Sequence, residues 1–567
     1  MKDSILFLVL RRMRAPLIAI ILIYAISIFG LTLIPGVDAE GQPTAPLSFF
    51  DAFYFISYTA STIGFGEIPV AFSYSQRFWV TICIYLTVIG WTYSILSILN
   101  LLKDDGLHRA LATSRFSRKT RRMTEPFCII CGMGETGSLI SQTLDQVQMR
   151  FVAIDHRPEP IQELELGDYQ ADVPALQADA QLPATLLLAG LQLPACKAVL
   201  AVTNNDDTNL AIAMNVRLLN PGIPIIARAE NASIAANMAS FGTNFIVDPY
   251  TLYARRLALA LRNPSGFQLV EWLTRVPETP LPEMPHPPTG HWIICGYGHF
   301  GRAIVHQLDA LGLHDQVTII DPRPTNPDDH KSILSNGTES SPLVDAGIAG
   351  AVGLVAGSDN DINNLSIAIT ARHLNPKLFI VMRQSSAANS ILFERFHANL
   401  TMVTTHTIAH ACLSFLTTPM LGRFVREIEK LDADWAEQVL NQLKPITKGL
   451  VPFVWRLNLT QAKTPALHQW LSNPENQSTP LQLLHLLTSN RHRDEPLALM
   501  ALAIERAGKL IILPAANTEL AIGDKILFAG VRDAWNEQRN AAQNLNALEY
   551  VILGHSATGS LLGRLLA

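Results

Sequence analysis

Two long runs of residues without any charged side chain constrain the fold of this chain more than any other feature. They cover Ala15–Ile34 and Phe78–Leu102, 20 and 25 residues, and a helix needs about 20 apolar residues to cross a bilayer. The first run is too long for a signal peptide, and further membrane-like sequence follows it instead of a mature domain. We therefore predict membrane-spanning helices at residues 15–34 and 78–102, which excludes a wholly soluble fold.

Lysine and arginine residues are concentrated on one side of the two predicted spans. None occurs in residues 35–76, between the spans, whereas residues 1–14 hold four and residues 103–122 hold seven. Because cationic flanks stay in the cytoplasm, we expect both termini to be cytoplasmic in a multi-pass protein of the cell inner (plasma) membrane. Residues 1–14 are then a cytosolic segment with a short helix at the membrane surface, and residues 103–125 a basic, helical linker.

Charge divides the chain into a basic head and an acidic body. Residues 1–122 contain 12 Lys and Arg against 7 Asp and Glu, and residues 123–567 contain 31 against 41. Only 16% of all residues are charged, compared with about 25% in soluble proteins. These numbers indicate a membrane anchor with a cytosolic body, with the lipid bilayer as a partner and no nucleic-acid partner.

A short apolar segment and a glycine-containing loop lie between the two spans. Residues 49–60 are too few to cross the membrane, so we predict a re-entrant pore helix there. Irregular backbone at membrane depth must be buried in protein or line a water-filled path. Glycines allow the left-handed backbone with which carbonyl oxygens can all face one axis; a plain glycine turn is the alternative. The loop consists of Thr62, Ile63, Gly64, Phe65, Gly66 and Glu67.

Residues 62–67 resemble the selectivity filter of potassium channels, and residues 15–102 resemble their two-span pore domain. The resemblance implies K+ as the permeant ion and Glu67 at the outer mouth of the filter. One loop cannot encircle an ion, so a homotetramer is expected. Phe65 stands where the family usually has Tyr, and Glu67 where it has Asp. A weakly selective cation channel is therefore an alternative to a potassium channel.

Gly90 lies in the middle of the second predicted span. In potassium channels a glycine at about this position of the inner helix is a gating hinge, so the resemblance implies that role here. A small residue that eases helix packing is the alternative.

A glycine-rich motif follows a buried-strand pattern twice in the acidic body. The motif G-x-G-x-x-G stands at the start of a helix, directly after a strand, and an acid follows at the end of the next strand. This order is the dinucleotide-binding fingerprint. Phosphates would bind the helix N-terminus, and the acid would accept hydrogen bonds from ribose. Glycines kept only for tight packing are the alternative. The first copy consists of Gly132, Gly134, Gly137 and Asp155, and the second of Gly296, Gly298, Gly301 and Asp321.

The body is an internal duplication. Residues 205–210 match residues 360–365 at an offset of 155, and Asn220-Pro221 matches Asn375-Pro376 at the same offset. Each copy alternates strands and helices with short links, which predicts two tandem Rossmann-like domains, each a doubly wound parallel α/β sheet. Residues 276–290, between the copies, hold six prolines and form an extended spacer.

Both copies resemble domains that regulate conductance of potassium (RCK domains, related to TrkA-N and TrkA-C). The resemblance assigns residues 126–275 to a first domain, 291–425 to a second and 426–535 to a smaller α+β C-terminal lobe. It implies a cytosolic gating ring, NAD/NADH or ADP/ATP as regulatory ligand, and Asp179 as a further polar contact. Residues 250–261 and 408–418 would be crossover helices that pair domains.

Calcium is another ligand of this family, and it needs several converging carboxylate oxygens. Candidates lie around the strand ends of the first copy, although Arg228 stands where calcium-gated relatives carry an acid. Solvent-facing loop acids are the alternative. The candidates are Asp206, Asp207, Glu230 and Asp248.

Two further interpretations concern catalysis and the C-terminus. A membrane-bound nicotinamide-dependent oxidoreductase is a rival function, but no catalytic His or Lys constellation accompanies either glycine motif, so we expect no enzyme. Residues 536–567 look like the start of a third Rossmann unit, with a strand at Tyr550–Leu553; coincidence in a short tail is the alternative. Cys128 and Cys131 lie in a buried strand, where packing is their expected role.

Overall fold

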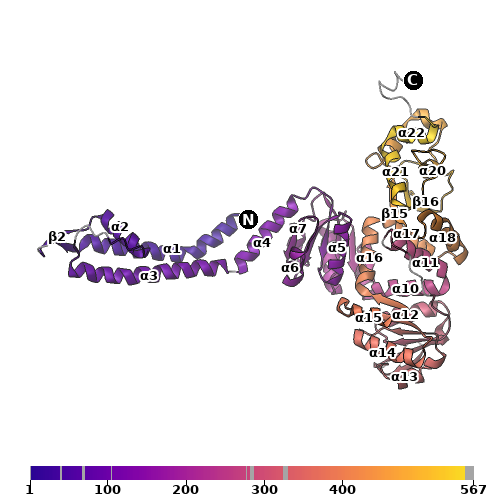
Figure 1. Cartoon of the computed structure of the whole chain (residues 1–567), viewed down its shortest axis with the longest axis horizontal. Helices are drawn as coiled ribbons and strands as arrows, with labels where there is room; N and C mark the ends of the chain where they lie inside the picture. Colours follow the sequence, from indigo (N-terminus) through magenta and orange to yellow (C-terminus); the bar gives the residue numbers. More distant parts are fainter. Residues whose placement is uncertain are drawn as a thin grey trace. The chain divides into compact units, whose positions relative to one another are not determined.

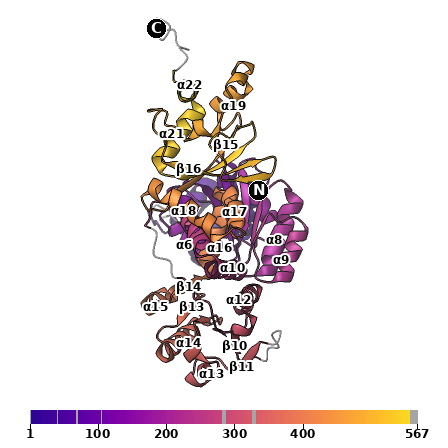
Figure 2. The same cartoon turned by 90° about the vertical axis from the view of Figure 1, so that its right-hand side faces the viewer.

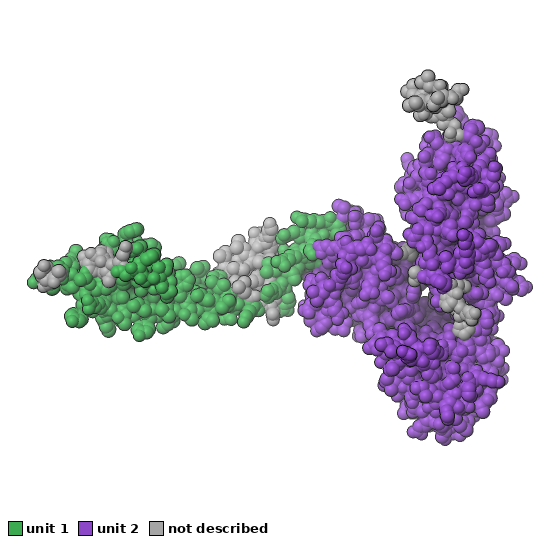
Figure 3. All heavy atoms as spheres, in the orientation of Figure 1, with its two compact units in different colours: residues 1–123, 188–190 green, residues 124–187, 191–567 purple. Residues whose placement is uncertain are grey.

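The computed structural model describes residues 2–38, 41–66, 71–103, 105–275, 277–280, 286–323 and 330–555. Glu67, residues 281–285 of the proline-rich spacer and residues 556–567 lie outside this description. The chain divides into two compact units, residues 1–123 with 188–190 and residues 124–187 with 191–567 (Figure 3).

Two antiparallel helices dominate the first unit, α1 (Lys2–Leu33) and α3 (Tyr74–Leu102) (Figure 1). Among the described residues, Met13–Leu33 and Tyr74–Asn100 are single helices long and apolar enough to cross a membrane, with mean hydropathies of 2.4 and 1.9. Side chains such as Ile21, Phe29 and Ile89 are exposed, as expected for helices that face lipid. The short surface helix expected near the N-terminus is continuous with α1.

The chain between α1 and α3 forms a strand pair and a short helix. Strands β1 (Pro35–Val37) and β2 (Pro43–Pro46) pair antiparallel, and α2 (Phe49–Ala60) follows. The Ser48 hydroxyl accepts the Asp51 N–H at 3.2 Å and caps α2. Phe55 and Ile56 of α2 pack in one apolar cluster with residues of both long helices, so α2 is held between them. Helix α4 (Asp105–Arg121) occupies the basic linker.

Helices α1 and α3 approach closely at Gly30. A methyl group on Gly30 would lie 2.1–2.5 Å from three indole atoms of Trp79. The Trp79 indole N–H donates to the carbonyl of Ser27 at 3.2 Å, which fixes the ring over the glycine. Gly30 is therefore required by the packing of the helix pair.

We expect Gly30→Ala to lower the free energy of unfolding by about 1–3 kcal/mol, the usual cost of overpacking. Thermal unfolding of the detergent-solubilised protein, followed by size-exclusion chromatography, measures the change. Gly422→Ala is the control, because a methyl group on Gly422, in α17 (Pro419–Ile428), meets nothing within 4 Å. Equal stability of both variants would contradict the packing role of Gly30.

The second unit contains two six-stranded parallel sheets with the same strand order. The first is ordered β5-β4-β3-β6-β7-β8 and the second β11-β10-β9-β12-β13-β14, the doubly wound order of the Rossmann fold. The predicted fold class is confirmed. The strands are β3 (Phe127–Cys131), β4 (Arg150–Asp155), β5 (Ala175–Gln177), β6 (Cys196–Ala201), β7 (Ile225–Arg228), β8 (Phe245–Val247), β9 (Trp292–Cys295), β10 (Val317–Asp321), β11 (Lys331–Leu334), β12 (Gly353–Ala356), β13 (Phe379–Gln384) and β14 (Leu400–Val403).

Helices cover both faces of the two sheets (Figure 2). In the first domain they are α5 (Glu135–Gln146), α6 (Pro158–Leu166), α7 (Pro183–Leu188), α8 (Asp206–Leu219) and α9 (Ala232–Ser240). In the second they are α12 (His299–Ala310), η1 (His314–Gln316), α13 (Ser340–Asp345), η2 (Ile348–Gly350), α14 (Asp361–Leu374), η3 (Ala387–Asn389) and α15 (Ser390–Phe396).

The two domains exchange their last helices. Helix α10 (Pro249–Arg262), which follows the first sheet, packs its Tyr250, Ala254 and Leu257 into the core of the second. Helix α16 (Thr404–Thr417), which follows the second sheet, packs into the core of the first and lies beside α5 (Figure 1). Arg383 of β13 reinforces the exchange, because its Nη2 donates to the Tyr250 hydroxyl at 2.7 Å.

A third body of structure follows the exchange. Helix α11 (Pro264–Thr274), α17 and α18 (Ala433–Thr447) share one apolar cluster with an antiparallel sheet ordered β15-β18-β16-β17. The prediction of a strand at Tyr550–Leu553 is wrong: these residues end a helix whose Leu548 and Ile552, four residues apart, are buried in the lobe. The remaining elements are β15 (Phe453–Asn458), α19 (Pro465–Ser472), η4 (Pro474–Ser478), α20 (Leu483–Leu487), β16 (Leu499–Arg506), β17 (Lys509–Ile512), β18 (Lys525–Gly530), α21 (Arg532–Gln543) and α22 (Leu545–Leu553).

A buried asparagine accounts for part of the sequence repeat. Asn209 Oδ1 accepts the Thr203 N–H and hydroxyl at 3.0 and 2.8 Å, and its Nδ2 donates to the carbonyls of Thr203 and Arg228 at 3.0 Å. Asn364 makes the same four bonds to Ser358 and Arg383 in the second copy. Each asparagine therefore ties the turn after one strand to the end of the next.

We expect Asn209→Ala to lower the free energy of unfolding by about 3 kcal/mol, because it leaves buried backbone groups without partners. Asn215→Ala, on the same helix, removes a single bond to the Gln181 carbonyl and should cost about 1 kcal/mol. Urea unfolding of the solubilised protein compares the two. A difference below the measurement error would mean that the Asn209 bonds are replaced by water.

Candidate functional site

The loop after α2 has an alternating backbone. Thr62, Gly64 and Gly66 have φ angles of 62°, 64° and 77°, in the left-handed region, whereas Ile63 and Phe65 between them do not. Such alternation turns successive carbonyl groups toward the same side of the chain. The left-handed Thr62 could not be predicted from the sequence, because a β-branched residue rarely adopts this conformation.

The end of α2 anchors this loop. The Tyr58 carbonyl accepts the N–H groups of Ile63 and Gly64 at 3.1 and 3.3 Å. The ring of Phe65 lies edge-on to Tyr58, with centroids 6.1 Å apart. The C-terminus of α2, which carries the negative end of the helix dipole, therefore meets the start of the loop. This arrangement favours a cation next to the loop.

The side chains of Ile63 and Phe65 are 60% and 64% exposed in the single chain. Methyl groups on Gly64 and Gly66 would also meet nothing within 4 Å. One face of the loop is thus uncovered by its own chain, whereas the core of the first unit buries the Tyr58 side.

Gly90 contacts α1 from the middle of α3. A methyl group on Gly90 would lie 2.5 Å from Ile23 Cδ1, the tip of a flexible side chain. Helix α3 is continuous from Tyr74 to Leu102. This contact gives direct support to the packing role of Gly90, and the hinge remains a prediction.

The three glycines of the first motif have different surroundings. Gly132 has a φ of 100°, and a methyl group there would meet Thr203 at 2.9 Å; one on Gly137 would lie 2.0 Å from the Gly132 carbonyl oxygen. Tight packing explains these two positions. A methyl group on Gly134 meets nothing closer than Arg157 at 3.8 Å, so no contact within the protein requires a glycine there. Gly134 is the N-cap of α5, where an incoming phosphate would approach.

The second motif repeats these surroundings. Gly296 has a φ of 95° and approaches the Ser358 backbone, Gly301 approaches the Gly296 carbonyl, and Gly298 faces open space. Gly298 is the N-cap of α12. Both copies thus keep the shape of a phosphate-binding turn.

The predicted ribose acids are buried beneath the glycine turns. Asp155 Oδ2 accepts the Met133 N–H at 2.7 Å and its Oδ1 accepts the Arg157 N–H at 2.8 Å. Asp321 accepts from Tyr297 and Arg323 in the same way, at 2.7 and 2.9 Å. Burial opposes ionisation of Asp321, but these donors outweigh it and hold the pKa of its carboxyl below the ordinary value. Each acid therefore also positions the glycine turn.

Two cations beside these acids were not predicted from the sequence. Arg157 and Arg323 both stand two residues after the acid, and their side chains are half-exposed or more. The shared D-x-R spacing in the two copies was the available signal. Glu135 places a negative charge on the first turn of α5, and it accepts from Ser386 and Ala387 of the second domain at 3.3 Å. The second copy has His299 there instead.

Asp179 is exposed just beyond β5, and it accepts the Gln181 N–H at 2.8 Å. It lies at the carboxyl ends of the parallel strands, as the first glycine turn does. In the second copy the corresponding turn contains Gly337, whose φ of 71° places its backbone against Cys295. Residues 335–338, which follow β11, therefore offer no acid that corresponds to Asp179.

The four candidate calcium ligands do not come together in the described residues. Asp206 accepts the N–H groups of Glu230 and Asn231 at 2.9 and 2.8 Å. Glu230 forms an ion pair with Arg228, and Asp248 caps α10. Asp207 lies exposed on the first turn of α8. Three of these acids thus have local partners, and no three of the four share a point in the part of the chain described.

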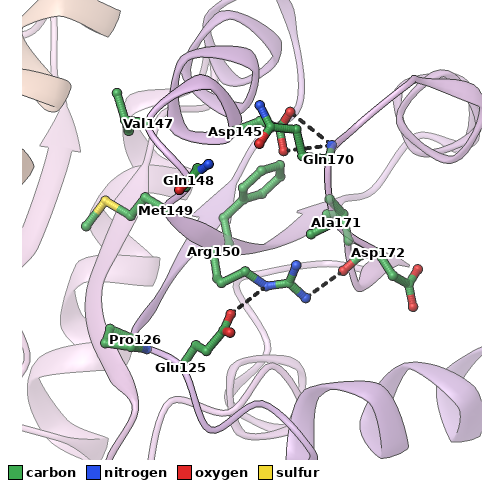
Figure 4. Close-up of a pocket in the computed structure, with 12 residues that line it drawn as sticks. Glu125, Pro126, Asp145, Val147, Gln148, Met149, Arg150, Gln170, Ala171 and Asp172 are labelled. Atoms are coloured by element: carbon green, nitrogen blue, oxygen red, sulfur yellow. Dashed lines mark hydrogen bonds and ion pairs between the residues drawn. The ribbon is translucent and has the colours of Figure 1, made fainter.

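A cavity of about 700 Å³ lies at the opposite end of the first sheet from the glycine turn (Figure 4). Arg150 in this cavity pairs with Glu125 at 3.5 Å and donates to the Asp172 carbonyl at 3.0 Å. Because it lies at the opposite end of the sheet, this cavity is distinct from the predicted nucleotide site. Burial, with a smaller contribution from Cys196, raises the pKa of the Cys128 thiol in β3 to about 12, in agreement with a packing role.

Known protein families match three parts of the chain. Residues 17–103 match the family described as ion channel, and residues 128–249 and 292–404 each match the TrkA-N domain. The chain therefore combines a part that belongs with ion channels and two parts that belong with TrkA-N domains, and its two long apolar helices indicate a membrane protein.

Three individual relatives of known name share a quarter or less of their aligned residues with this chain. A probable potassium channel protein 2 from Methanocaldococcus jannaschii is 25% identical over 242 residues, which cover 42% of this chain and 65% of that protein. Potassium channel protein 1 of the same organism is 24% identical, over 41% of this chain and 67% of its own length. A solved structure of the GsuK channel bound to NAD covers 94% of this chain and 98% of that chain, at 16% identity and a TM-score of 0.44.

Proposed function

We propose that this chain is the subunit of a homotetrameric potassium channel whose TrkA-N domains bind a nucleotide that controls the pore. The observation that carries the proposal is the alternating left-handed backbone at Thr62, Gly64 and Gly66, directly after the C-terminus of α2. Main-chain oxygens in this arrangement replace the water shell of an alkali ion.

Four copies are needed because one loop offers oxygens from one side only. The exposed Ile63 and Phe65 side chains and the open space at Gly64 and Gly66 agree with a surface that further subunits cover. A closed four-fold ring of identical subunits satisfies this requirement. Both chain termini then lie in the cytoplasm, on the side of the basic flanks.

The nucleotide binds at the glycine turns in this proposal. The free N–H groups at the start of α5 or α12 meet the phosphates, and Arg157 or Arg323 adds positive charge. The ligand is NAD/NADH or ADP/ATP. Contacts within the protein do not require a glycine at residue 134 or 298, and the space beside both residues is open. This open space supports a bound group at both positions. Calcium at the four acids has no such support.

Control of the pore follows from differential binding. A nucleotide shifts the equilibrium between an open and a closed ring only by its different affinity for the two. The shift reaches the pore through α4, which begins at Asp105, shortly after α3 ends at Leu102. The movement of α4 bends or rotates α3 near Gly90.

Flux measurements test the proposal. Purified protein reconstituted in liposomes should carry K+ down a gradient and Na+ much more slowly, and NAD, NADH, ADP or ATP added singly should change the K+ rate. Equal K+ and Na+ rates would favour the weakly selective cation channel. The supporting observation for that alternative is that Phe65 lacks the hydroxyl of the Tyr that potassium channels usually have at this position. Absence of any flux, with tetramers present, would reject conduction.

A further inference from the structure

Three side chains with metal-binding atoms converge at the end of the second sheet that lies opposite the glycine turn. Asp309 lies in the last turn of α12, His314 begins η1, and His330 immediately precedes β11. His314 Nδ1 lies 3.2 Å from Asp309 Oδ1, and His330 Nε2 lies 3.2 Å from Asp309 Oδ2. All three ligand atoms lie within 4.8 Å of one another.

The spacing fits a small divalent ion. Two ligands at the usual zinc distances of 2.0–2.1 Å in a tetrahedral site are roughly 3.3 Å apart. Each imidazole nitrogen has about that separation from one oxygen of the Asp309 carboxylate, His314 from Oδ1 and His330 from Oδ2. Without an ion, these nitrogens donate N–H groups to the carboxylate; with an ion, each imidazole binds as the other tautomer, its proton on the ring nitrogen that faces away from the ion.

Burial adds a second observation. The His330 side chain is 1% exposed, and its Nδ1 has no hydrogen-bond partner. A buried imidazole that is held through one nitrogen only is costly unless its contact is strong. His314 is 43% exposed and Asp309 30% exposed, so an ion can reach the cluster from solvent.

The cluster opens into a cavity of about 410 Å³ that His314 and His330 line together with His291, Thr318 and Lys331. The Lys331 ammonium donates to the Asp345 carbonyl at 2.8 Å, and His291 Nε2 bonds the Thr318 hydroxyl at 2.9 Å. A fourth position on the ion therefore remains for water.

The first copy provides an internal comparison. Asp145 stands eleven residues after Gly134, as Asp309 stands eleven after Gly298. Asp145 lines the cavity in Figure 4, but there it accepts the Gln170 N–H at 3.1 Å, and its neighbours are Gln148, Arg150 and Val173. Both domains therefore have a cavity at the corresponding end of the sheet, and histidines line only the cavity of the second domain.

We propose that Asp309, His314 and His330 form a binding site for a divalent transition-metal ion of the zinc class, with water as the fourth ligand. Three protein ligands of nitrogen and carboxylate type with one open position are typical for such ions. The ion joins the end of α12 to the start of β11 across η1. The site is separate from the glycine turn and stands independently of the proposed nucleotide.

Equilibrium dialysis of the full, tag-free, chelator-treated protein with Zn2+, and the visible absorption of bound Co2+, test the site. We expect one ion per chain, and a loss of affinity of at least about 10–100-fold in His314→Ala and in Asp309→Asn, since even outer-shell changes cost that much. His314 is partly exposed, so its variant should fold; circular dichroism checks this.

His306→Ala is the matched control, because His306 is exposed on the same helix α12 and bonds only Gln307 among the contacts described. It should bind Zn2+ like the unchanged protein, and Zn2+ should raise the unfolding temperature of both but not of His314→Ala. Zn2+ binding that is absent, or that is equal in His314→Ala and His306→Ala, would overturn the proposal.

Discussion

Potassium flux through Gly64→Asp should fall to the leak rate of protein-free liposomes. Gly64 has a φ of 64°, a conformation that costs an L-residue with a Cβ roughly 1–2 kcal/mol. An added carboxylate would also stand beside the carbonyl oxygens and bind the ion that must pass. Both effects act on the oxygens that replace the hydration of the ion, so conduction should stop while the fold of the second unit and its nucleotide binding remain.

Gly41→Asp separates backbone strain from loss of the filter. Gly41 has a φ of 83° and, like Gly64, open space around it, but it lies in the turn between β1 and β2. Its variant suffers the same strain and should keep most of the flux. Liposome flux in a K+ gradient compares the two, and substantial flux through Gly64→Asp would mean that residues 62–66 are not the filter.

Gly134→Val should weaken nucleotide binding to the first TrkA-N domain at least about 30-fold. Its side chain would fill the space at the N-cap of α5 that contacts within the protein leave open, and overpacking of about 2 kcal/mol corresponds to that factor. The Gly134 φ of −71° suits any residue, so the fold should be unaffected. Isothermal titration with NAD and with ADP measures the change.

Gly222→Val, in an open turn of the same domain, is the control and should bind as the unchanged protein does. Gly298→Val makes the same test of the second copy, so the pair of variants assigns the ligand to one domain or both. Unchanged affinity in both Gly134→Val and Gly298→Val would move the nucleotide away from the glycine turns. Asp155→Ala is a poorer test, because Asp155 also holds the Met133 N–H of the turn.

Much of the fold follows from local sequence. The uncharged runs, the glycine motifs after buried strands and the repeat at an offset of 155 each reflect a short-range requirement, so two apolar helices and two Rossmann-like domains could be predicted. The strand expected at Tyr550–Leu553 failed because a short apolar run fits a strand or a buried helix equally well, and packing of Leu548 and Ile552 against the lobe decides for the helix.

The candidate sites were less predictable wherever they depend on contacts between distant segments. The inward bonds of Asp155 and Asp321 depend on the path of the glycine turns. Asp309, His314 and His330 span 22 residues without any motif spacing, and only the pairing of β10 with β11 brings His330 to the end of α12. The exchange of α10 and α16 likewise depends on which sheet each helix can reach.

That exchange makes the duplicated halves mutually dependent. A fragment that stops in the proline-rich spacer keeps α10 but lacks α16, so the apolar side of its sheet around Ile130 and Leu200 would face water. The complementary fragment would lack Tyr250 and Leu257 over Trp292. Cleavage by a protease in this spacer should therefore yield two insoluble pieces in place of two working modules, and an early stop codon there should yield an insoluble N-terminal piece.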